Sequence, residues 1–225
     1  MTSHCTAGKR PRRHDLVFVS QEGWRALLAT RRDPAANPLV TLWGDRGWPL
    51  IGRRAVPGDL YGVPLGLPLP PFAGKGRLSL LVQPQDIVST MLPLPLGSAH
   101  SAAPRAWRTT LDALQELATR HSVDARVFGS LAWRALTGLD YLTDRSDLDL
   151  LLYVHRDTDL YRLAIDVADI EAAAPMRLDG EFIRDDGAAV NWREFNSGAR
   201  EILVKTVGTV ALRDTARFLL EEVGS

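Results

Sequence analysis

The sequence contains little cysteine, few aromatic residues and no long hydrophobic run. Its single cysteine among 225 residues, Cys5, permits neither an internal disulfide nor a cluster of thiolate metal ligands. The apolar runs are far shorter than the roughly 20 residues of a membrane-spanning helix. The basic residues near the start are not followed by an apolar stretch of signal-peptide length. We therefore expect a cytoplasmic protein that does not associate with membranes.

Net charge is also absent, but the charges are unevenly distributed. Residues 1–105 contain 13 Lys and Arg against 6 Asp and Glu, a balance of +7, and residues 106–225 contain 14 against 21, a balance of −7. This asymmetry indicates either two modules, one for anionic groups and one that gathers carboxylates around cations, or two complementary halves that dock. Because the sequence has no stripe of basic and aromatic residues, we expect no nucleic-acid partner.

The first half predicts a small β-rich domain. A hydrophobic content of 45% and a mean hydropathy of −0.08 are typical of a globular protein, and 225 residues suffice for two small domains. One helix is predicted at residues 21–30. Short apolar stretches predict four strands: residues 16–20, 39–43, 49–52 and 78–82. Residues 62–71 contain four prolines, which lack backbone donors, so we expect an extended loop there.

A second proline-rich stretch separates the two halves. Residues 93–98, followed by the small residues 99–103, predict a linker. We place the domain boundary near residue 100. This gives a basic, β-rich domain over residues 1–100, which would bind substrate or a carrier protein, and a catalytic domain over residues 101–225.

The second half has clearer periodicity. Apolar residues spaced for one helix face are Trp107, Leu111, Leu114 and Ala118. Asp185-Asp186-Gly187 between strands 176–183 and 188–192 predicts a hairpin, because Asp-Gly tolerates a positive φ. The other predicted elements are strands 125–128, 148–154 and 209–212 and helices 130–136, 160–174, 197–205 and 214–223. The fold class is therefore α+β, with an α/β-like mixed sheet flanked by helices.

Two carboxylates and a strand-to-helix turn carry the chemistry. Alternation along the strand places Asp147 and Asp149 on one face, where they repel each other until a cation such as Mg²⁺ binds. Gly129 and Ser130 lie where a strand turns into a helix, and the free N–H groups of such a turn favour phosphate oxygens. Together these features predict a metal-assisted phosphoryl-type transfer with Asp147 and Asp149 as catalytic residues.

The same residues resemble a known superfamily. Gly129-Ser130 followed by Asp147-Leu148-Asp149 is similar to the signature of nucleotidyltransferases with a DNA polymerase β-like palm. The resemblance implies a palm-like catalytic domain, two magnesium ions and a third carboxylate on a later strand. Asp179 and Glu181 lie on one face of the predicted strand 176–183, and either could be that third metal ligand.

A narrower resemblance covers most of the chain. Residues 130–152, with His14-Asp15-Leu16 upstream, resemble the malonate decarboxylase holo-acyl-carrier-protein synthases, also called phosphoribosyl-dephospho-CoA transferases. Three further stretches fit the same family: residues 66–75, 179–181 and 191–194. The resemblance implies transfer of the prosthetic group from 2′-(5″-triphosphoribosyl)-3′-dephospho-CoA to a serine of the apo acyl carrier protein of malonate decarboxylase, with release of pyrophosphate.

This chemistry assigns roles to the residues of the site. Asp147 and Asp149 would bind Mg²⁺, and one of them would help to deprotonate the serine hydroxyl. Gly129 and Ser130 would hold the departing pyrophosphate. The basic residues that could bind substrate phosphates or an acidic carrier surface, or else form a solvated basic face, are Arg53, Arg54 and Lys75.

Two other functions share parts of this pattern. A related nucleotidyltransferase would use the same aspartates to adenylylate a small molecule or a protein from ATP. A catalytically silent member of the fold would be a binding module, but the presence of both Asp147 and Asp149 argues against that interpretation.

Overall fold

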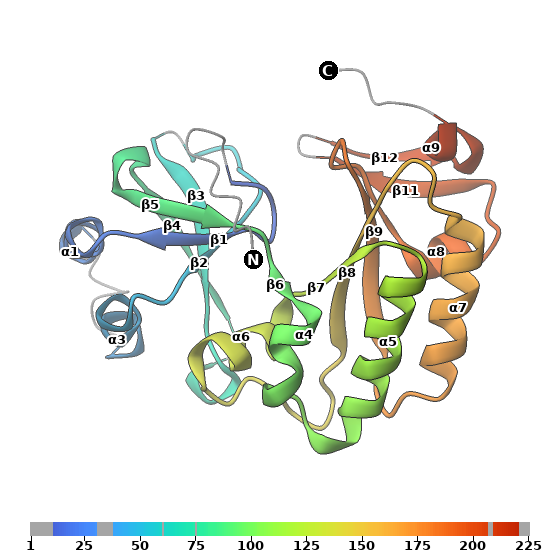
Figure 1. The fold of residues 1–225 in the computed structure, drawn as a ribbon. Helices are drawn as coiled ribbons and strands as arrows, with labels where there is room; N and C mark the ends of the chain where they lie inside the picture. Colours follow the sequence, from blue (N-terminus) through green and yellow to red (C-terminus); the bar gives the residue numbers. More distant parts are fainter. Residues whose placement is uncertain (1–10, 31–37, 60, 75, 207–208, 221–225) are drawn as a thin grey trace. The chain divides into compact units, whose positions relative to one another are not determined.

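The chain folds into two compact units, Met1–Pro93 and Leu94–Ser225. A computed structural model describes residues 11–30, 38–59, 61–74, 76–206 and 209–220 (Figure 1). Each unit is built around its own sheet and carries helices as well, so the fold class is α+β as predicted. Among the described residues, no helix is both long and apolar enough to cross a membrane.

The first unit contains a five-stranded antiparallel sheet in the order β4-β3-β2-β1-β5. Its strands are β1 (Leu16–Val19), β2 (Leu50–Gly52), β3 (Val63–Pro68), β4 (Arg77–Val82) and β5 (Ile87–Met91). Its helices are α1 (Gln21–Thr30) and α3 (Pro38–Arg46), with 3₁₀ turns η1 (Pro71–Ala73) and η2 (Pro84–Asp86). The predicted helix at 21–30 and the strands that begin at Leu16, Leu50 and Arg77 are thus confirmed, whereas β5 has no counterpart among the predicted strands.

The loop predicted over residues 62–71 is wrong, because β3 is an inner strand of this sheet. The Pro64 carbonyl accepts a hydrogen bond from the Arg53 N–H, so even-numbered residues of β3 direct their backbone groups towards β2. Strand β2 is only three residues long and pairs with Leu65 and Gly66. The two prolines of β3, Pro64 and Pro68, lie beyond the ends of β2. Their missing N–H groups therefore remove no hydrogen bond between these two strands.

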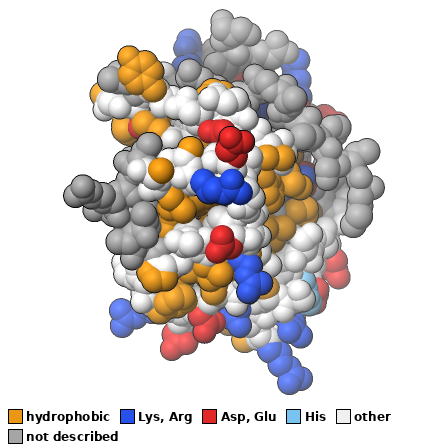
Figure 2. Space-filling view, turned by 90° about the vertical axis from the view of Figure 1, so that its left-hand side faces the viewer, with side chains coloured by type: hydrophobic (Ala, Val, Ile, Leu, Met, Phe, Trp, Pro, Cys, Tyr) orange, Lys and Arg blue, Asp and Glu red, His pale blue; other side chains and the backbone are white. Residues whose placement is uncertain are grey.

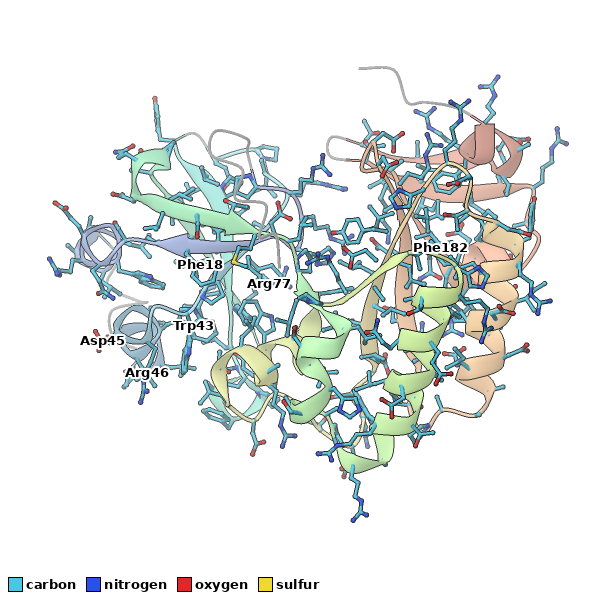
Figure 3. The ribbon with its side chains drawn as sticks, in the orientation of Figure 1. Phe18, Trp43, Asp45, Arg46, Arg77 and Phe182 are labelled. Atoms are coloured by element: carbon cyan, nitrogen blue, oxygen red, sulfur yellow. The ribbon has the colours of Figure 1, made fainter. Side chains whose placement is uncertain are left out.

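The strand predicted at 39–43 is also wrong, since these residues belong to α3. The buried residues of α3 are Val40, Trp43 and Gly44, which follow helical rather than alternating spacing. The Trp43 indole N–H donates to the Pro49 carbonyl at 3.0 Å. Asp45 and Arg46 are exposed at the end of the helix (Figure 3). A short apolar run without a clear period is compatible with a strand or a helix. The packing of Trp43 stabilises the helix.

The second unit contains a seven-stranded sheet in the order β12-β11-β10-β9-β8-β7-β6. Strands β8 and β9 are parallel, and the other neighbouring pairs are antiparallel. The strands are β6 (Leu94–Pro95), β7 (Asp124–Val127), β8 (Leu148–Val154), β9 (Leu178–Arg184), β10 (Ala189–Asn191), β11 (Glu201–Lys205) and β12 (Val210–Asp214). The helices are α4 (Leu96–Ala99), α5 (Arg108–Arg120), α6 (Gly129–Thr137), α7 (Leu160–Ala172), α8 (Trp192–Asn196) and α9 (Thr215–Leu220), with 3₁₀ turns η3 (His100–Ala102) and η4 (Arg105–Trp107). The predicted mixed sheet is confirmed.

The predicted linker at 93–103 is instead part of the second unit. Residues 94–102 form β6, α4 and η3, and Leu96 and Ala99 are fully buried in the core of this unit. The units divide between Pro93 and Leu94, before the predicted boundary near residue 100. Small and proline-rich residues here allow close packing against α5 and α6, so their composition does not mark a free segment.

The helix predicted at 197–205 is wrong, because Glu201–Lys205 form β11. Ile202 and Val204 are buried while Glu201 is exposed, which is the two-residue period of a strand. The hairpin at Asp185-Asp186-Gly187 is confirmed by the β9–β10 pairing. Helix α9 confirms the helix predicted at 214–223, of which residues 221–223 lie outside the described residues.

Strand β8 lies at the centre of the second core. Leu148, Leu150 and Leu151 are fully buried, as expected for a strand covered on both faces. Helices α5 and α7 pack side by side against the sheet (Figure 1). Strand β8 also contacts α6, and the two predicted aspartates lie at the start of β8.

A buried carboxylate joins α5 to α7. Asp166 of α7 is 6% exposed and lies 2.8 Å from Nε2 of His121, which follows α5. Arg162 and Arg120 lie 3.1 and 3.3 Å from the same carboxylate. The hydrogen bond from His121 lowers the pKa of Asp166, with smaller contributions from the two arginines. The cluster therefore stabilises the folded state when Asp166 is ionised.

We expect Asp166→Asn to lower the free energy of unfolding at pH 7 by about 1–3 kcal/mol, because three cationic or hydrogen-bonding partners lose the charge that they face. The folded-state pKa is depressed, so this stability is present above the unfolded pKa near 4 and is lost as the pH falls through the folded value. Urea unfolding at pH 7 and at pH 3 measures both effects. Asp169→Asn, at an exposed position of the same helix, is the matched control; equal losses in the two variants would contradict the prediction.

Candidate active site

Three aspartates lie at one edge of the central strands. Asp147 immediately precedes β8, and Asp149 is the second residue of that strand. The parallel register of β8 and β9 pairs Asp149 with Asp179. Paired residues of neighbouring strands direct their side chains to the same face of a sheet. The structure therefore brings Asp179 to the two aspartates that the sequence had already placed together.

Asp149 is the most perturbed carboxylate of this group. Burial, together with the negative charges of Asp179 and Asp147, raises its pKa to about 7, and a hydrogen bond from the Ser130 backbone N–H opposes the shift. Ionisation of a partly buried carboxyl group beside two other carboxylates is unfavourable unless a cation approaches. Strongly shifted pKa values of this origin are typical of functional sites.

Gly129 permits the close approach of Asp149 to helix α6. Gly129 has a φ of +64°, and a Cβ atom there would lie 1.8 Å from Asp149 Oδ2. The Phe128 N–H also donates to the Asp149 carbonyl at 3.1 Å, which ties the end of β7 to the start of β8. The turn at Gly129 and Ser130, which was predicted to bind phosphate, thus holds the Asp149 carboxyl group at the N-terminus of α6. Trp133, further along α6, is buried against Tyr141.

The two candidates for the third carboxylate have different surroundings. The side chain of Asp179 is 44% exposed, and its charge raises the pKa of Asp149. The side chain of Glu181 is 9% exposed, and its carboxylate accepts a hydrogen bond from Lys205 Nζ at 2.6 Å. Glu181 lies beside Leu151, two residues further along the strands than Asp149. The geometry therefore favours Asp179 over Glu181 as the partner of Asp149.

Residues 191–194 brace the Asp179 side of the site. Asn191 Nδ2 donates to Asp179 Oδ1 at 3.3 Å, and Asn191 Oδ1 caps α8 by accepting from the Arg193 and Glu194 N–H groups. Arg193 forms an ion pair with Glu171 of α7 and donates to the Leu178 carbonyl at 2.9 Å. No role was predicted for Arg193 or Glu171 from the sequence. Arg193 lies in the family-like stretch at 191–194, but a local stretch does not show that Glu171 of α7 is its partner.

The carboxylate oxygens of the three aspartates fit a hard divalent cation, although the side chains do not converge on one point as they stand. Carboxylate oxygens are the ligands that Mg²⁺ prefers, and a cation would relieve the repulsion at Asp149. Within the described part of the chain, no three His, Cys, Asp or Glu side chains are arranged so that they could hold a metal ion as they stand. Asp149 is directed towards Ser130, so a metal bound by all three aspartates would require their carboxylates to turn.

The comparisons with known proteins cover both units. Residues 12–93 match the phosphoribosyl-dephospho-CoA transferase MdcG N-terminal domain, and residues 94–216 match the corresponding C-terminal domain. The chain belongs to the phosphoribosyl-dephospho-CoA transferase family. The two matches meet at the boundary between the compact units.

Individual members of the phosphoribosyl-dephospho-CoA transferase family are closely similar. A phosphoribosyl-dephospho-CoA transferase of Bradyrhizobium diazoefficiens is 56% identical over 226 residues, which cover 100% of both chains. One of Xanthomonas campestris pv. campestris is 38% identical over 194 residues, 86% of this chain and 89% of the relative. No solved structure matches the chain. Family membership makes the protein a transferase.

The basic residues predicted to bind substrate lie in the N-terminal family domain. Arg53 forms an ion pair with Asp59 at 2.7 Å and lowers the pKa of that carboxyl to about 2, so it holds the loop after β2. Arg54 is exposed, and Lys75 lies outside the described residues. Figure 2 shows the described Lys and Arg side chains spread over the drawn face, with several near its lower edge. Substrate binding by these three residues stays a prediction.

Proposed function

We propose that the protein transfers the phosphoribosyl-dephospho-CoA group from 2′-(5″-triphosphoribosyl)-3′-dephospho-CoA to a serine of the apo acyl carrier protein of malonate decarboxylase. The serine oxygen forms a bond to the α-phosphorus, the bond between the α- and β-phosphates breaks, and pyrophosphate leaves. The serine proton passes to a carboxylate and then to solvent. The observation that carries this proposal is the convergence of Asp147, Asp149 and Asp179 beside the N-terminus of α6, in a chain of this family.

The N-terminus of α6 would hold the leaving pyrophosphate. The Ser130 N–H already donates a hydrogen bond to the Asp149 carboxyl group at this position. Backbone donors at the start of a helix stabilise phosphate oxygens in the same way. A phosphate oxygen that replaced Asp149 at this N–H would release the carboxylate towards Asp147 and Asp179. Glycine at position 129 leaves the space that this exchange requires.

Magnesium is the proposed cofactor, with two ions bound. Asp147, Asp149 and Asp179 would hold them, and bound Mg²⁺ would neutralise the charge that develops on the phosphates. Asp147 or Asp149 would accept the proton of the serine hydroxyl, since both are placed at the edge of the sheet where the phosphates would lie. Arg193 and Asn191 would keep Asp179 in place from the other side.

The test is to incubate the purified chain and Mg²⁺ with apo malonate decarboxylase carrier protein and either triphosphoribosyl-dephospho-CoA or ATP, and to record the intact mass of the carrier. We expect a mass increase equal to the phosphoribosyl-dephospho-CoA group, together with release of pyrophosphate. An increase equal to an adenylyl group would assign the protein to the ATP-dependent alternative. No increase with either donor would leave the binding-module interpretation.

The third carboxylate can be tested in the same assay. We expect Asp179→Asn to reduce transfer on the order of 100-fold, because a ligand oxygen is lost. Glu181→Gln should reduce transfer by less than about tenfold, because its carboxylate is engaged by Lys205 and its loss affects mainly packing. Rates measured over a range of Mg²⁺ concentrations should show a higher Mg²⁺ concentration at half-maximal rate only for the Asp179 variant. The opposite ranking would assign the role to Glu181.

A further inference from the structure

A shallow surface pocket of about 700 Å³, open to solvent, lies at the start of β9 and does not include the three aspartates. It is lined by Glu171, Ala174, Pro175, Met176, Arg177 and Arg193. The segment that precedes β9 forms its wall, and α7 and α8 contribute Glu171 and Arg193. The pocket is shallow and open to solvent, so it suits a segment on a protein surface better than an enclosed small molecule.

The pocket adjoins the candidate active site. The Arg177 carbonyl accepts a hydrogen bond from the N–H of Leu148, the residue between the two aspartates, at 2.9 Å. Arg177 Nη2 lies 4.0 Å from Asp179 Oδ1. The pKa of Arg193 is raised mainly by its hydrogen bond to Glu171, and also by the charges of Asp179 and Asp147. A molecule in the pocket would therefore lie next to the carboxylates.

The pocket and the helix N-terminus lie on opposite sides of Asp149. In the sheet order, β7 lies on one side of β8 and β9 lies on the other. Helix α6 follows β7 along the chain, and the pocket lies at the start of β9. Asp149 accepts from Ser130 on the first side and faces Asp179 on the second. If the triphosphate of the donor binds at α6, the attacking group must approach from another direction, and the pocket is adjacent to that path.

The charges of the pocket suit a protein segment better than a triphosphate. Arg193 is paired with Glu171 and lies with its guanidinium 4.5 Å from the Trp192 ring centre, so it forms a fixed wall. Arg177 has a side chain that is 59% exposed, and its nearest carboxylate is the 4.0 Å contact to Asp179. One net positive charge beside the apolar residues Pro175 and Met176 is suited to one acidic side chain with apolar neighbours. It is too little to neutralise a triphosphate.

We propose that this pocket is the acceptor site, and that it binds an acidic segment of the acceptor protein next to the serine that is modified. The proposal rests on the proposed function for the identity of the acceptor. Arg177 pairs with the acidic side chain of that segment, and the wall formed by Arg193 and Glu171 positions the segment beside Asp179.

Arg177→Ala and Arg177→Glu test the proposal with the full chain, apo malonate decarboxylase carrier protein and triphosphoribosyl-dephospho-CoA. We expect the KM for the carrier to rise about tenfold for Arg177→Ala, and further for Arg177→Glu, as a charge-assisted hydrogen bond is lost. The Kd of the donor, measured by calorimetry, should stay at the wild-type value. Arg200→Ala is the matched control, because the Arg200 side chain is 93% exposed and 3.9 Å from Asp214 at a different part of the sheet.

Direct binding separates this proposal from the function on which it rests. Calorimetry with apo carrier protein and no donor should show binding to wild type and to Arg200→Ala, and weaker binding to both Arg177 variants. That result would support the pocket even if no group were transferred, in which case only the proposed reaction would fail. The acceptor assignment would be overturned if Arg177→Glu bound the carrier as tightly as wild type does. It would also be overturned if the Kd of the donor rose while the KM for the carrier stayed unchanged.

Discussion

Replacing Asp149 by Asn is expected to reduce transfer on the order of 1,000-fold, because the variant loses the charge proposed to hold Mg²⁺ and one of the two proposed acceptors for the serine proton. The amide has nearly the shape of the carboxylate, so its oxygen can still accept from the Ser130 N–H. The loss should therefore appear in kcat. Initial rates from the intact mass of the carrier protein, at saturating donor and carrier, measure it.

Stability distinguishes a catalytic loss from misfolding. The folded state raises the pKa of Asp149 to about 7 from 3.8, so the folded protein retains a proton that the unfolded chain has released. Without metal, wild-type stability should fall as the pH rises between these two values, and the Asn variant should lack that decline. At pH 8 the variant should be at least as stable as wild type. Asp144→Asn, at an exposed acid in the loop that precedes β8, should retain full activity. Wild-type turnover in Asp149→Asn would refute the assigned role.

The centre of the site was predictable from the sequence because its geometry is local. Gly129 and Ser130 follow one short strand, and Asp147 and Asp149 are separated by a single residue at the start of another. Strand alternation and the donors at a helix start are properties of the backbone, so no distant contact is needed to place these groups. The third carboxylate was not predictable in this way. The choice between Asp179 and Glu181 depends on the register of β8 with β9 and on Lys205 of β11.

The errors in the fold have the same origin. Strand β3 tolerates its prolines only because β2, a separate strand, is too short to pair with them. Helix α3 is fixed by the burial of Trp43, and the segment at 94–102 by its packing with α5 and α6. In each case the local composition permits two conformations, and a contact with a distant residue selects one. The alternation of Ile202 and Val204 in β11 was a local signal, and the helix prediction there missed it.

Gly129→Ala is expected to reduce transfer by about 100-fold or more, since displacement of a reacting group by about 1 Å can have this effect. Position 129 has a φ of +64°, and the added Cβ would lie 1.8 Å from Oδ2 and 2.5 Å from Cγ of Asp149. The Asp149 carboxylate must therefore move, or the start of α6 must shift away from β8. Either change separates the N–H groups proposed to bind pyrophosphate from the aspartates.

Gly138→Ala provides the control, because Gly138 ends the same helix with a φ of +74° and has no atom within 4 Å of an added Cβ. It should show only the cost of the left-handed backbone conformation, about 1 kcal/mol in the free energy of unfolding, and normal turnover. A double-mutant cycle isolates the contact: in an Asp149→Ala background, Gly129→Ala should destabilise the chain no more than Gly138→Ala does. Wild-type turnover in Gly129→Ala would show that the close packing of Asp149 against Gly129 does not organise the site. The same conclusion would follow if Gly129→Ala destabilised the Asp149→Ala background as much as it destabilises wild type.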